Sequence, residues 1–149
     1  MELIDKKISL MIWKTSNIWL SILRKTLKKY SLTPNEFIIL ETLYSFKNSN
    51  KNISQVFLSK SSGIDIAVIS SVLKILDKKS LIKRKIDTDN RKKIVKLTTE
   101  ANTLLNKILP LTDEAEIFFF KKLGNEKTNF CNALKLILGK KIRIQAERD

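Results

Sequence analysis

The chain has 149 residues, of which 43 % are hydrophobic, and it carries a formal net charge of +14 with a pI of about 9.9. This length allows one domain with a substantial core, and the apolar content argues against intrinsic disorder. The chain contains no histidine and one cysteine, Cys131, so it offers no imidazole base, zinc-binding cluster or internal disulfide. We therefore expect no enzymatic activity, no catalytic residues, no metal site and no cofactor. The positive charge favours a polyanionic partner.

Two features of the sequence predict a cytoplasmic protein that does not act at a membrane. The single thiol suits a reducing compartment, and the chain contains no apolar run of about 18 residues. Residues 8–23 imitate a signal peptide, but polar residues at 14–17 interrupt the apolar run and no small-residue cleavage site follows.

Two helices are predicted in the first third of the chain. Apolar residues recur near helical spacing over residues 5–30, and this stripe fits either the core or a subunit interface. The next helix begins with Thr33 as its cap, Pro34 at its first position and Glu36 at its third. It should end near Phe46, where a polar, turn-like segment begins.

Residues 54–76 are predicted to form a helix, a tight turn and a second helix. Ser54 and Asp65 can cap the two helices, and Gly63 can end the first one in a left-handed conformation. In the second helix, apolar residues spaced by three and four should pack inward: Ile69, Val72, Leu73 and Leu76. The outer face is then Ile66, Ala67, Ser70, Ser71 and Lys74.

This outer face has the chemistry of a DNA recognition helix. Small side chains let the helix backbone approach base edges, where a serine hydroxyl can form hydrogen bonds and a methyl group can contact thymine. On its own the face is better explained as that of an ordinary helix with a weakly polar surface. The basic hairpin that follows favours DNA binding.

The hairpin is predicted from two short apolar and basic runs around a turn. Its first strand begins at Leu81, residues 87–90 form the turn, and residues 94–97 return as the second strand. Between residues 74 and 96 there are ten basic and three acidic residues, which suits contacts with DNA phosphates. The predicted contacts are Arg84, Lys85, Asn90, Arg91, Lys92 and Lys93, with Arg91 at the tip entering the minor groove.

The rest of the chain, residues 99–149, is predicted to be helical. Pro110 should kink or split a long helix, and an apolar stripe over residues 130–142 marks the last one. Cys131 lies on this last helix, where we expect a small buried core residue rather than a redox sensor.

Residues 32–37, 62–81 and 87–98 resemble the MarR family of bacterial transcription regulators. The resemblance covers roughly residues 8–145 and implies a mainly α fold with a small β-hairpin wing (α+β). In that fold a winged helix-turn-helix lies between N- and C-terminal dimerisation helices. Residues 1–149 then form a single MarR-like chain, with residues 33–98 as the DNA-binding part and residues 1–30 and 99–149 as the dimerisation part.

The chain departs from the family pattern at four positions, one of which is Asn102 in place of the usual glycine after the wing. The acidic residue that the family often places beside the wing arginine is Asn90 here, which removes one ion pair. The recognition helix often carries an arginine where this chain has Ser71, so base reading should differ. The usual glycine before the first wing strand is Ser80.

The resemblance implies a homodimer in which the first and last helices of the two chains are entwined. The apolar stripes of these helices support this independently, since they flank the DNA-binding part and need burial. A two-fold dimer would read a pseudo-palindromic operator. The predicted dimerisation residues are Ile8, Ile12, Trp19, Phe130, Leu134, Ile137 and Leu138.

The family is usually regulated by a small, often aromatic ligand, and the resemblance implies such an effector here. Its pocket could involve Trp13, Trp19, Phe37 and Tyr44, although core packing explains these residues at least as well. The leading hypothesis is a homodimeric repressor that binds specific double-stranded DNA and is released by a small ligand. The alternative is a global or nucleoid-like DNA-binding protein with low sequence preference, which the small, arginine-poor helix face favours.

Overall fold

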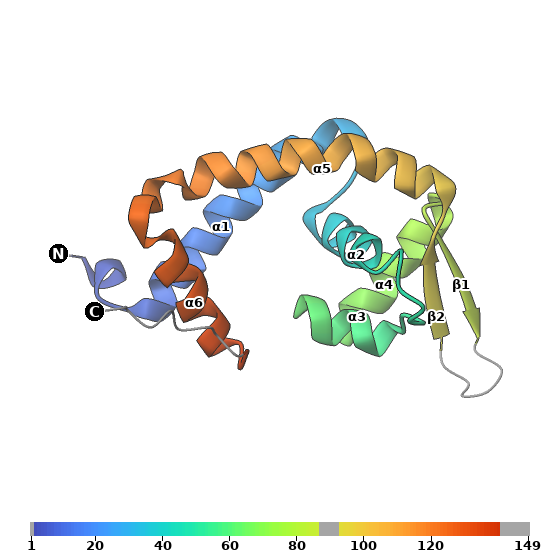
Figure 1. Ribbon diagram of the computed structural model, residues 1–149, viewed down its shortest axis with the longest axis horizontal. Coiled ribbons are helices and arrows are strands. Elements are labelled where there is room, and N and C mark those ends of the chain that lie inside the picture. The colour runs from blue at the N-terminus through green and yellow to red at the C-terminus, as the bar shows by residue number, and fades with distance from the viewer. Residues whose placement is uncertain (1, 87–92, 141–149) are drawn as a thin grey trace, which may run out of the picture. The chain divides into compact units, whose positions relative to one another are not determined.

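The computed structural model describes residues 2–86 and 93–140 (Figure 1). The chain divides into two compact units, Met1–Asp113 and Glu114–Asp149, and each is described by itself. The order of elements confirms the predicted mainly helical fold with a small antiparallel hairpin. The elements are η1 (Leu3–Asp5), α1 (Ile8–Leu27), η2 (Lys28–Tyr30), α2 (Pro34–Ser45), α3 (Gln55–Ser62), α4 (Ile66–Lys78), β1 (Ile82–Ile86), β2 (Lys93–Leu97), α5 (Thr99–Phe120), η3 (Lys121–Glu126) and α6 (Lys127–Ile137).

The predicted start signals of α2, α3 and α4 are confirmed. Thr33 accepts a hydrogen bond from the Glu36 backbone N–H, and the Glu36 carboxylate accepts one from the Thr33 N–H, which completes a capping box. Ser54 caps α3 and Asp65 caps α4 through their side-chain oxygens. Gly63 ends α3 with a φ of 74°, a conformation that glycine adopts without steric cost.

The wing is a two-stranded antiparallel sheet in which Ile82 pairs with Leu97 and Ile86 with Lys93. It is joined to the helices at its base. The Val95 N–H donates to the Ile53 carbonyl over 2.9 Å, and the Thr98 hydroxyl donates to the Ser80 carbonyl over 2.8 Å. These bonds fix the strands against the segments that enter α3 and leave α4.

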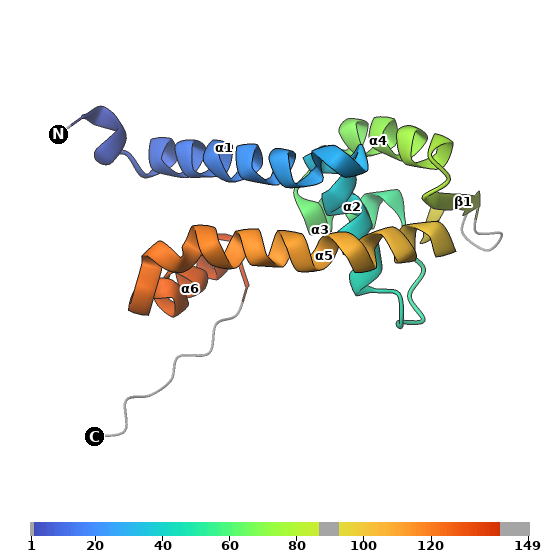
Figure 2. The ribbon, with the colours of Figure 1, turned by 90° about the horizontal axis from the view of Figure 1, so that it is seen from above.

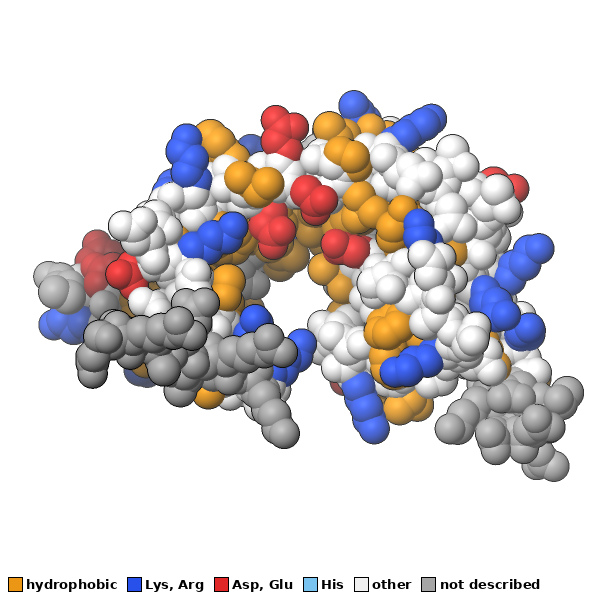
Figure 3. All heavy atoms as spheres, viewed as in Figure 1, with side chains coloured by type: hydrophobic (Ala, Val, Ile, Leu, Met, Phe, Trp, Pro, Cys, Tyr) orange, Lys and Arg blue, Asp and Glu red, His pale blue; other side chains and the backbone are white. Residues whose placement is uncertain are grey.

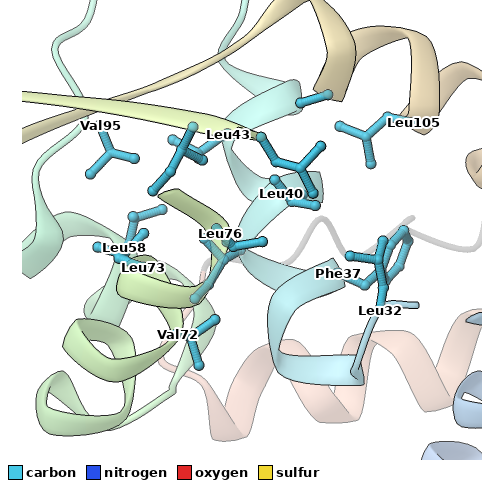
Figure 4. Close-up of a cluster of buried hydrophobic side chains, with 14 of the residues drawn as sticks. Leu32, Phe37, Leu40, Leu43, Leu58, Val72, Leu73, Leu76, Val95 and Leu105 are labelled. Atoms are coloured by element: carbon cyan, nitrogen blue, oxygen red, sulfur yellow. The ribbon is translucent and has the colours of Figure 1, made fainter. Parts of the chain in front are cut away.

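One core joins α2, α3, α4, the wing and the first half of α5, as Figure 4 shows. The inward positions predicted for α4 are confirmed, with Ile69, Leu73 and Leu76 fully buried and Val72 nearly so. The rest of this core comes from the flanking elements and includes Phe37, Leu40, Leu58, Val95 and Leu105.

The N-terminal half of α1 projects away from this core (Figure 2). Within α1 only Leu23 and Leu27, near its C-terminal end, are buried. Both pack in the same cluster as α2. The core therefore holds α1 by its last two turns, and the earlier part of the helix leaves apolar side chains uncovered.

Pro110 was expected to kink or split the long helix, and the split is wrong, because α5 is continuous from Thr99 to Phe120. Proline removes one backbone donor, which would have bonded the carbonyl of Asn106 four residues earlier. Asn106 is exposed, so water can satisfy that carbonyl. On both sides of the proline, Ile108 and Thr112 remain buried and hold the helix in place.

The second unit begins within α5 and is built around aromatic side chains. The Phe119 and Phe120 rings lie edge to face with centroids 4.8 Å apart, and Phe120 lies 6.3 Å from Phe130 of α6. No residue of α6 is fully buried. The prediction that Cys131 is a buried core residue is therefore wrong. Cys131 is exposed, because α6 packs only partly and Cys131 lies at the edge of that packing.

Among the described residues, no single helix is long and apolar enough to cross a membrane. Only α3 and α4 taken together reach the necessary length and hydropathy, across a bend of 114°. The residues that make α4 apolar include Ile69, Leu73 and Leu76, which are buried in the core.

Candidate nucleic-acid interface

The outer face of α4 is the first part of the candidate interface. The structure leaves Ile66, Ala67, Ser71 and Lys74 exposed, and Ser70 half-buried. These positions were expected to face outward from the spacing of the buried residues. All five predicted residues therefore lie on the surface of one helix or at its edge.

The exposed face of α4 is broader than predicted. Ala67, Ser71, Lys74 and Lys78 form a continuous stripe opposite the buried one, since they follow the helical repeat. Beside it lie two apolar residues that the sequence interpretation missed, Val68 and Ile75, which are 39 % and 44 % exposed. Continuing the helical spacing to the end of α4 would have found them. They add methyl groups to the surface that a DNA groove would meet.

Local hydrogen bonds keep the start of α4 compact. The Asp65 carboxylate accepts from the Ala67 N–H over 2.9 Å, and the Ser71 hydroxyl donates to the Ala67 carbonyl over 3.2 Å. Because the Ser71 proton is used inside the helix, its oxygen remains free to accept a hydrogen bond from a base or a water molecule. Ala67 and Ser71 therefore present little side-chain bulk on this part of the helix.

The wing strands provide the second part of the interface, and their basic residues are exposed: Lys83, Arg84, Lys85, Lys93 and Lys96. Figure 3 shows Lys and Arg side chains along the edge of the molecule that these strands form. Lys83 lies directly opposite Lys96 in the ladder. Like charges in that position destabilise a sheet, so a bound polyanion would stabilise the wing.

The tip of the wing lies outside the described residues. Three of the predicted contacts fall there: Asn90, Arg91 and Lys92. Of the other wing predictions, Arg84, Lys85 and Lys93 lie on the exposed strands.

Arg84 has an additional role that the sequence did not reveal. Its Nη2 and Nε atoms lie 3.0 and 3.3 Å from Oδ2 of Asp77 in α4. The pair links the first wing strand to the C-terminal part of α4. Because both side chains are partly exposed, the pair contributes little to stability, but it sets the direction of the Arg84 side chain.

A surface cleft of about 860 Å³ lies where α1 meets α2. Its lining includes the apolar residues Leu20, Leu32 and Pro34 and the cations Arg24 and Lys28. Both cations are exposed. The cleft therefore combines an apolar surface with positive charge, which suits an aromatic or aliphatic anion.

The four aromatic residues considered for an effector pocket have different surroundings. Phe37 is buried in the core, as core packing predicted, and Trp19 is partly buried against it. The Tyr44 hydroxyl donates to Asn106 Oδ1 over 2.8 Å. Trp13 is 70 % exposed, so its assignment to the core of this chain is wrong. It lies on the projecting part of α1, beyond the last core contacts.

The predicted dimerisation residues are mostly uncovered in the single chain. Ile8 and Ile137 are 69 % and 70 % exposed. Ile12, Leu134 and Leu138 are also exposed, while Trp19 and Phe130 are half-buried. Further apolar residues outside the predicted set are exposed on α1 (Met11, Trp13 and Ile18), at the end of α5 (Ile117 and Phe118) and on α6 (Leu136).

Comparison with known proteins finds a MarR-family match in the central part of the chain. Residues 32–94, from the start of α2 to the second wing strand, match the sequence model of the MarR family. The chain carries a MarR-family domain. The match confirms the resemblance seen in the sequence. It also confirms that this chain is not an enzyme, because MarR-family proteins are transcription regulators.

Relatives of the MarR domain span almost the whole chain. An uncharacterized HTH-type transcriptional regulator of Bacillus subtilis (strain 168), YdcH, is 26% identical over 129 residues, which cover 86% of this chain and 87% of the relative. A mutant MarR from E. coli complexed with operator DNA is 21% identical, with a TM-score of 0.78 over 93% of this chain and 99% of that chain. CouR from Rhodococcus jostii RHA1, bound to p-coumaroyl-CoA, is 17% identical, with a TM-score of 0.79 over 97% and 100%. The two structures establish the same winged-helix fold.

Proposed function

We propose that this MarR-family regulator is a homodimeric repressor that acts in the cytoplasm on a pseudo-palindromic operator. The observation that carries the proposal is the outer surface of α4. Small residues and exposed methyl groups lie there beside a wing whose strands carry five exposed cations. Small side chains permit close approach to base edges, and the cations supply contacts with phosphates. Residues 33–98 are the DNA-binding part in this proposal.

Dimerisation is supported by the apolar residues that α1 and α6 expose. Scattered surface hydrophobic residues are ordinary, but Ile8, Ile12 and Trp13 are all exposed within the first two turns of α1. Ile137 and Leu138 form a second exposed group at the end of α6. Residues 1–30 and 99–149 would bury these groups in a dimer. The two recognition helices would then contact half-sites about one DNA turn apart.

Release by a small ligand is supported by the cleft between α1 and α2. Its apolar residues and cations suit an aromatic ligand that carries a negative charge. The relative CouR was solved with p-coumaroyl-CoA bound. A ligand lowers operator affinity only if it prefers the conformation that binds DNA less well.

The experiment that tests the proposal is selection of bound sites from a random duplex library with purified protein, followed by measurement of affinity against salt. A repressor of this kind should recover a pseudo-palindrome with half-sites about one helical turn apart. It should also bind that site at least about a thousandfold more tightly than random duplex. Binding with a steep salt dependence but no recovered motif would instead support the nucleoid-like alternative.

A further inference from the structure

Lys79, the residue that ends the recognition helix, contacts the junction between α1 and α2. Its ammonium group donates to Oε1 of Glu36 over 2.6 Å and to the Ser31 carbonyl over 2.6 Å. Glu36 is 43 residues away in the sequence, and Ser31 is 48 residues away. One side chain therefore ties the C-terminal end of α4 to the start of α2 and to the segment that leaves α1.

Glu36 cannot easily give up this partner. The residue is only 2 % exposed, and its second carboxylate oxygen accepts from the Thr33 N–H over 2.7 Å. The capping box thus fixes the carboxylate in one orientation. A buried carboxylate that loses its cation is strongly destabilised, so the Lys79 contact is maintained by the burial of Glu36.

Because the Lys79 contact lies at one end of α4, a small change there displaces the residues proposed to contact DNA at the other end. α4 has 13 residues, so it is about 20 Å long, and a tilt of about 10° at one end moves the other by about 3 Å. Lys79 holds the C-terminal end, while the small outer residues Ala67 and Ser71 lie in the first half. A recognition helix must be held within about 0.5 Å and 10–20° to form its contacts.

We infer that Lys79 is a positioning residue for DNA recognition, which orients α4 through Glu36 and Ser31 without touching DNA. The inference rests on the proposed function, since it assigns a role within the same DNA-binding surface. The same contact couples α4 to the end of α1, the helix proposed to form the dimer. The spacing between two recognition helices in a dimer then depends on Lys79 in each chain.

The inference is tested with four proteins: the wild type, Lys79→Met, the double variant Glu36→Gln/Lys79→Met, and Lys78→Met as the matched control. Lys78 is the neighbouring exposed lysine at the same helix end and has no ion pair among the described residues. Each is measured for unfolding in denaturant and for affinity to the selected duplex at several salt concentrations. In the double variant no charge is left buried, and the introduced amide oxygen can still accept the hydrogen bond from the Thr33 N–H.

Lys79→Met should lose both stability and at least about tenfold in affinity, with an unchanged slope of log affinity against log salt. The double variant should regain stability but not affinity, because the connection to α4 is still absent. If Lys79→Met does not fold, Glu36→Gln alone replaces it as the reference for the double variant. The Lys78→Met control should leave stability unchanged, and any loss of affinity should come with a shallower slope.

Two results would overturn the inference while leaving the proposed function intact. If the slope of log affinity against log salt is shallower by about 0.9 in Lys79→Met than in the wild type, Lys79 contacts a phosphate directly. Recovery of affinity together with stability in the double variant would show a merely structural role. Failure of the wild type to bind any duplex would overturn the proposed function, and this inference with it.

Discussion

At Ser80 the chain turns from α4 into the wing with a φ of 58°. A residue with a Cβ is disfavoured in this left-handed region by about 1–2 kcal/mol. The backbone there is also tied down, because the Ser80 N–H donates to Asp77 and its carbonyl accepts from Thr98. The strain is therefore stored at the joint between α4 and the wing.

Ser80→Gly should stabilise the protein by up to about 1 kcal/mol. Glycine adopts this φ without steric cost, although part of the gain is lost because glycine makes the unfolded chain more flexible. The gain is measured as a higher midpoint of denaturant unfolding with an unchanged slope. Ser80→Ala is the matched control, since it removes the hydroxyl but keeps the Cβ, and it should not stabilise. Equal gains in both variants would contradict the role of backbone strain.

The buried Glu36 carboxyl makes stability depend on pH. Burial raises its pKa, but the hydrogen bonds from Lys79 and Thr33 and the charge of Lys79 outweigh this, so its pKa lies below the ordinary 4.5. A depressed pKa in the folded state contributes stability that is present above pH 4.5. That stability is lost as the pH falls through the folded-state pKa.

Glu36→Gln should therefore reduce the acid sensitivity of the protein. The variant should be less stable than the wild type at pH 7, and the difference should shrink as the pH falls below 4.5, where the wild-type carboxyl takes up a proton. Unfolding in denaturant at a series of pH values from 7 to about 3 measures this. A difference that stays constant across the series would mean that Glu36 does not titrate in this range.

At the level of the element, a single charge placed on α4 is expected to affect stability and DNA affinity differently. Ala67→Glu adds a negative charge at the second position of the helix, where it interacts favourably with the positive end of the helix dipole. Stability should therefore stay equal or rise by a few tenths of a kcal/mol. The same charge would face the DNA phosphates, so affinity for the selected duplex should fall by at least about tenfold.

Ser9→Glu provides the matched control, because Ser9 is exposed and holds the second position of α1. It makes the same charge change at the same place in a helix outside the DNA-binding part. Its affinity for the duplex should stay within about twofold of the wild type. Equal losses in both variants would mean that overall charge, rather than the face of α4, controls binding.

Local signals predicted the elements well, whereas contacts between distant residues were not predictable. The caps at Thr33, Ser54 and Asp65 and the turn at Gly63 depend on residues within four positions, and all four are confirmed. The bridge from Lys79 to Glu36 and the pair between Arg84 and Asp77 depend on how the helices meet. No periodicity within one segment contains that information.

The failures at Pro110 and Cys131 have the same origin. A single proline was expected to kink or split α5, but the helix is not split, and buried residues on both sides hold it in place. Cys131 was expected to be buried because its neighbours are apolar, yet α6 has no fully buried residue. Both the continuity of α5 and the exposure of Cys131 depend on tertiary packing, which cannot be derived from the local sequence pattern.

At the scale of the whole molecule, the exposed apolar residues of α1 distinguish a monomer from a dimer. In a monomer, Ile12, which is 49 % exposed, would tolerate a charged residue with little loss of stability. In a dimer the same charge would be buried without a partner, which costs several kcal/mol. Ile12→Glu should therefore lower the mass in solution from that of a dimer to that of a monomer and lower the melting temperature.

The control for this prediction is Val56→Glu. Val56 is 55 % exposed but lies on α3, within the winged helix-turn-helix, so the variant should keep the mass of the dimer. Sedimentation equilibrium at several protein concentrations measures both variants and the wild type. Because a dimer places two recognition helices on one operator, the monomeric Ile12→Glu variant should also bind a half-site and the full pseudo-palindrome with similar affinity. A wild type that sediments as a monomer and still prefers the full site would rule out the proposed α1 interface and require a second contact that forms only on DNA.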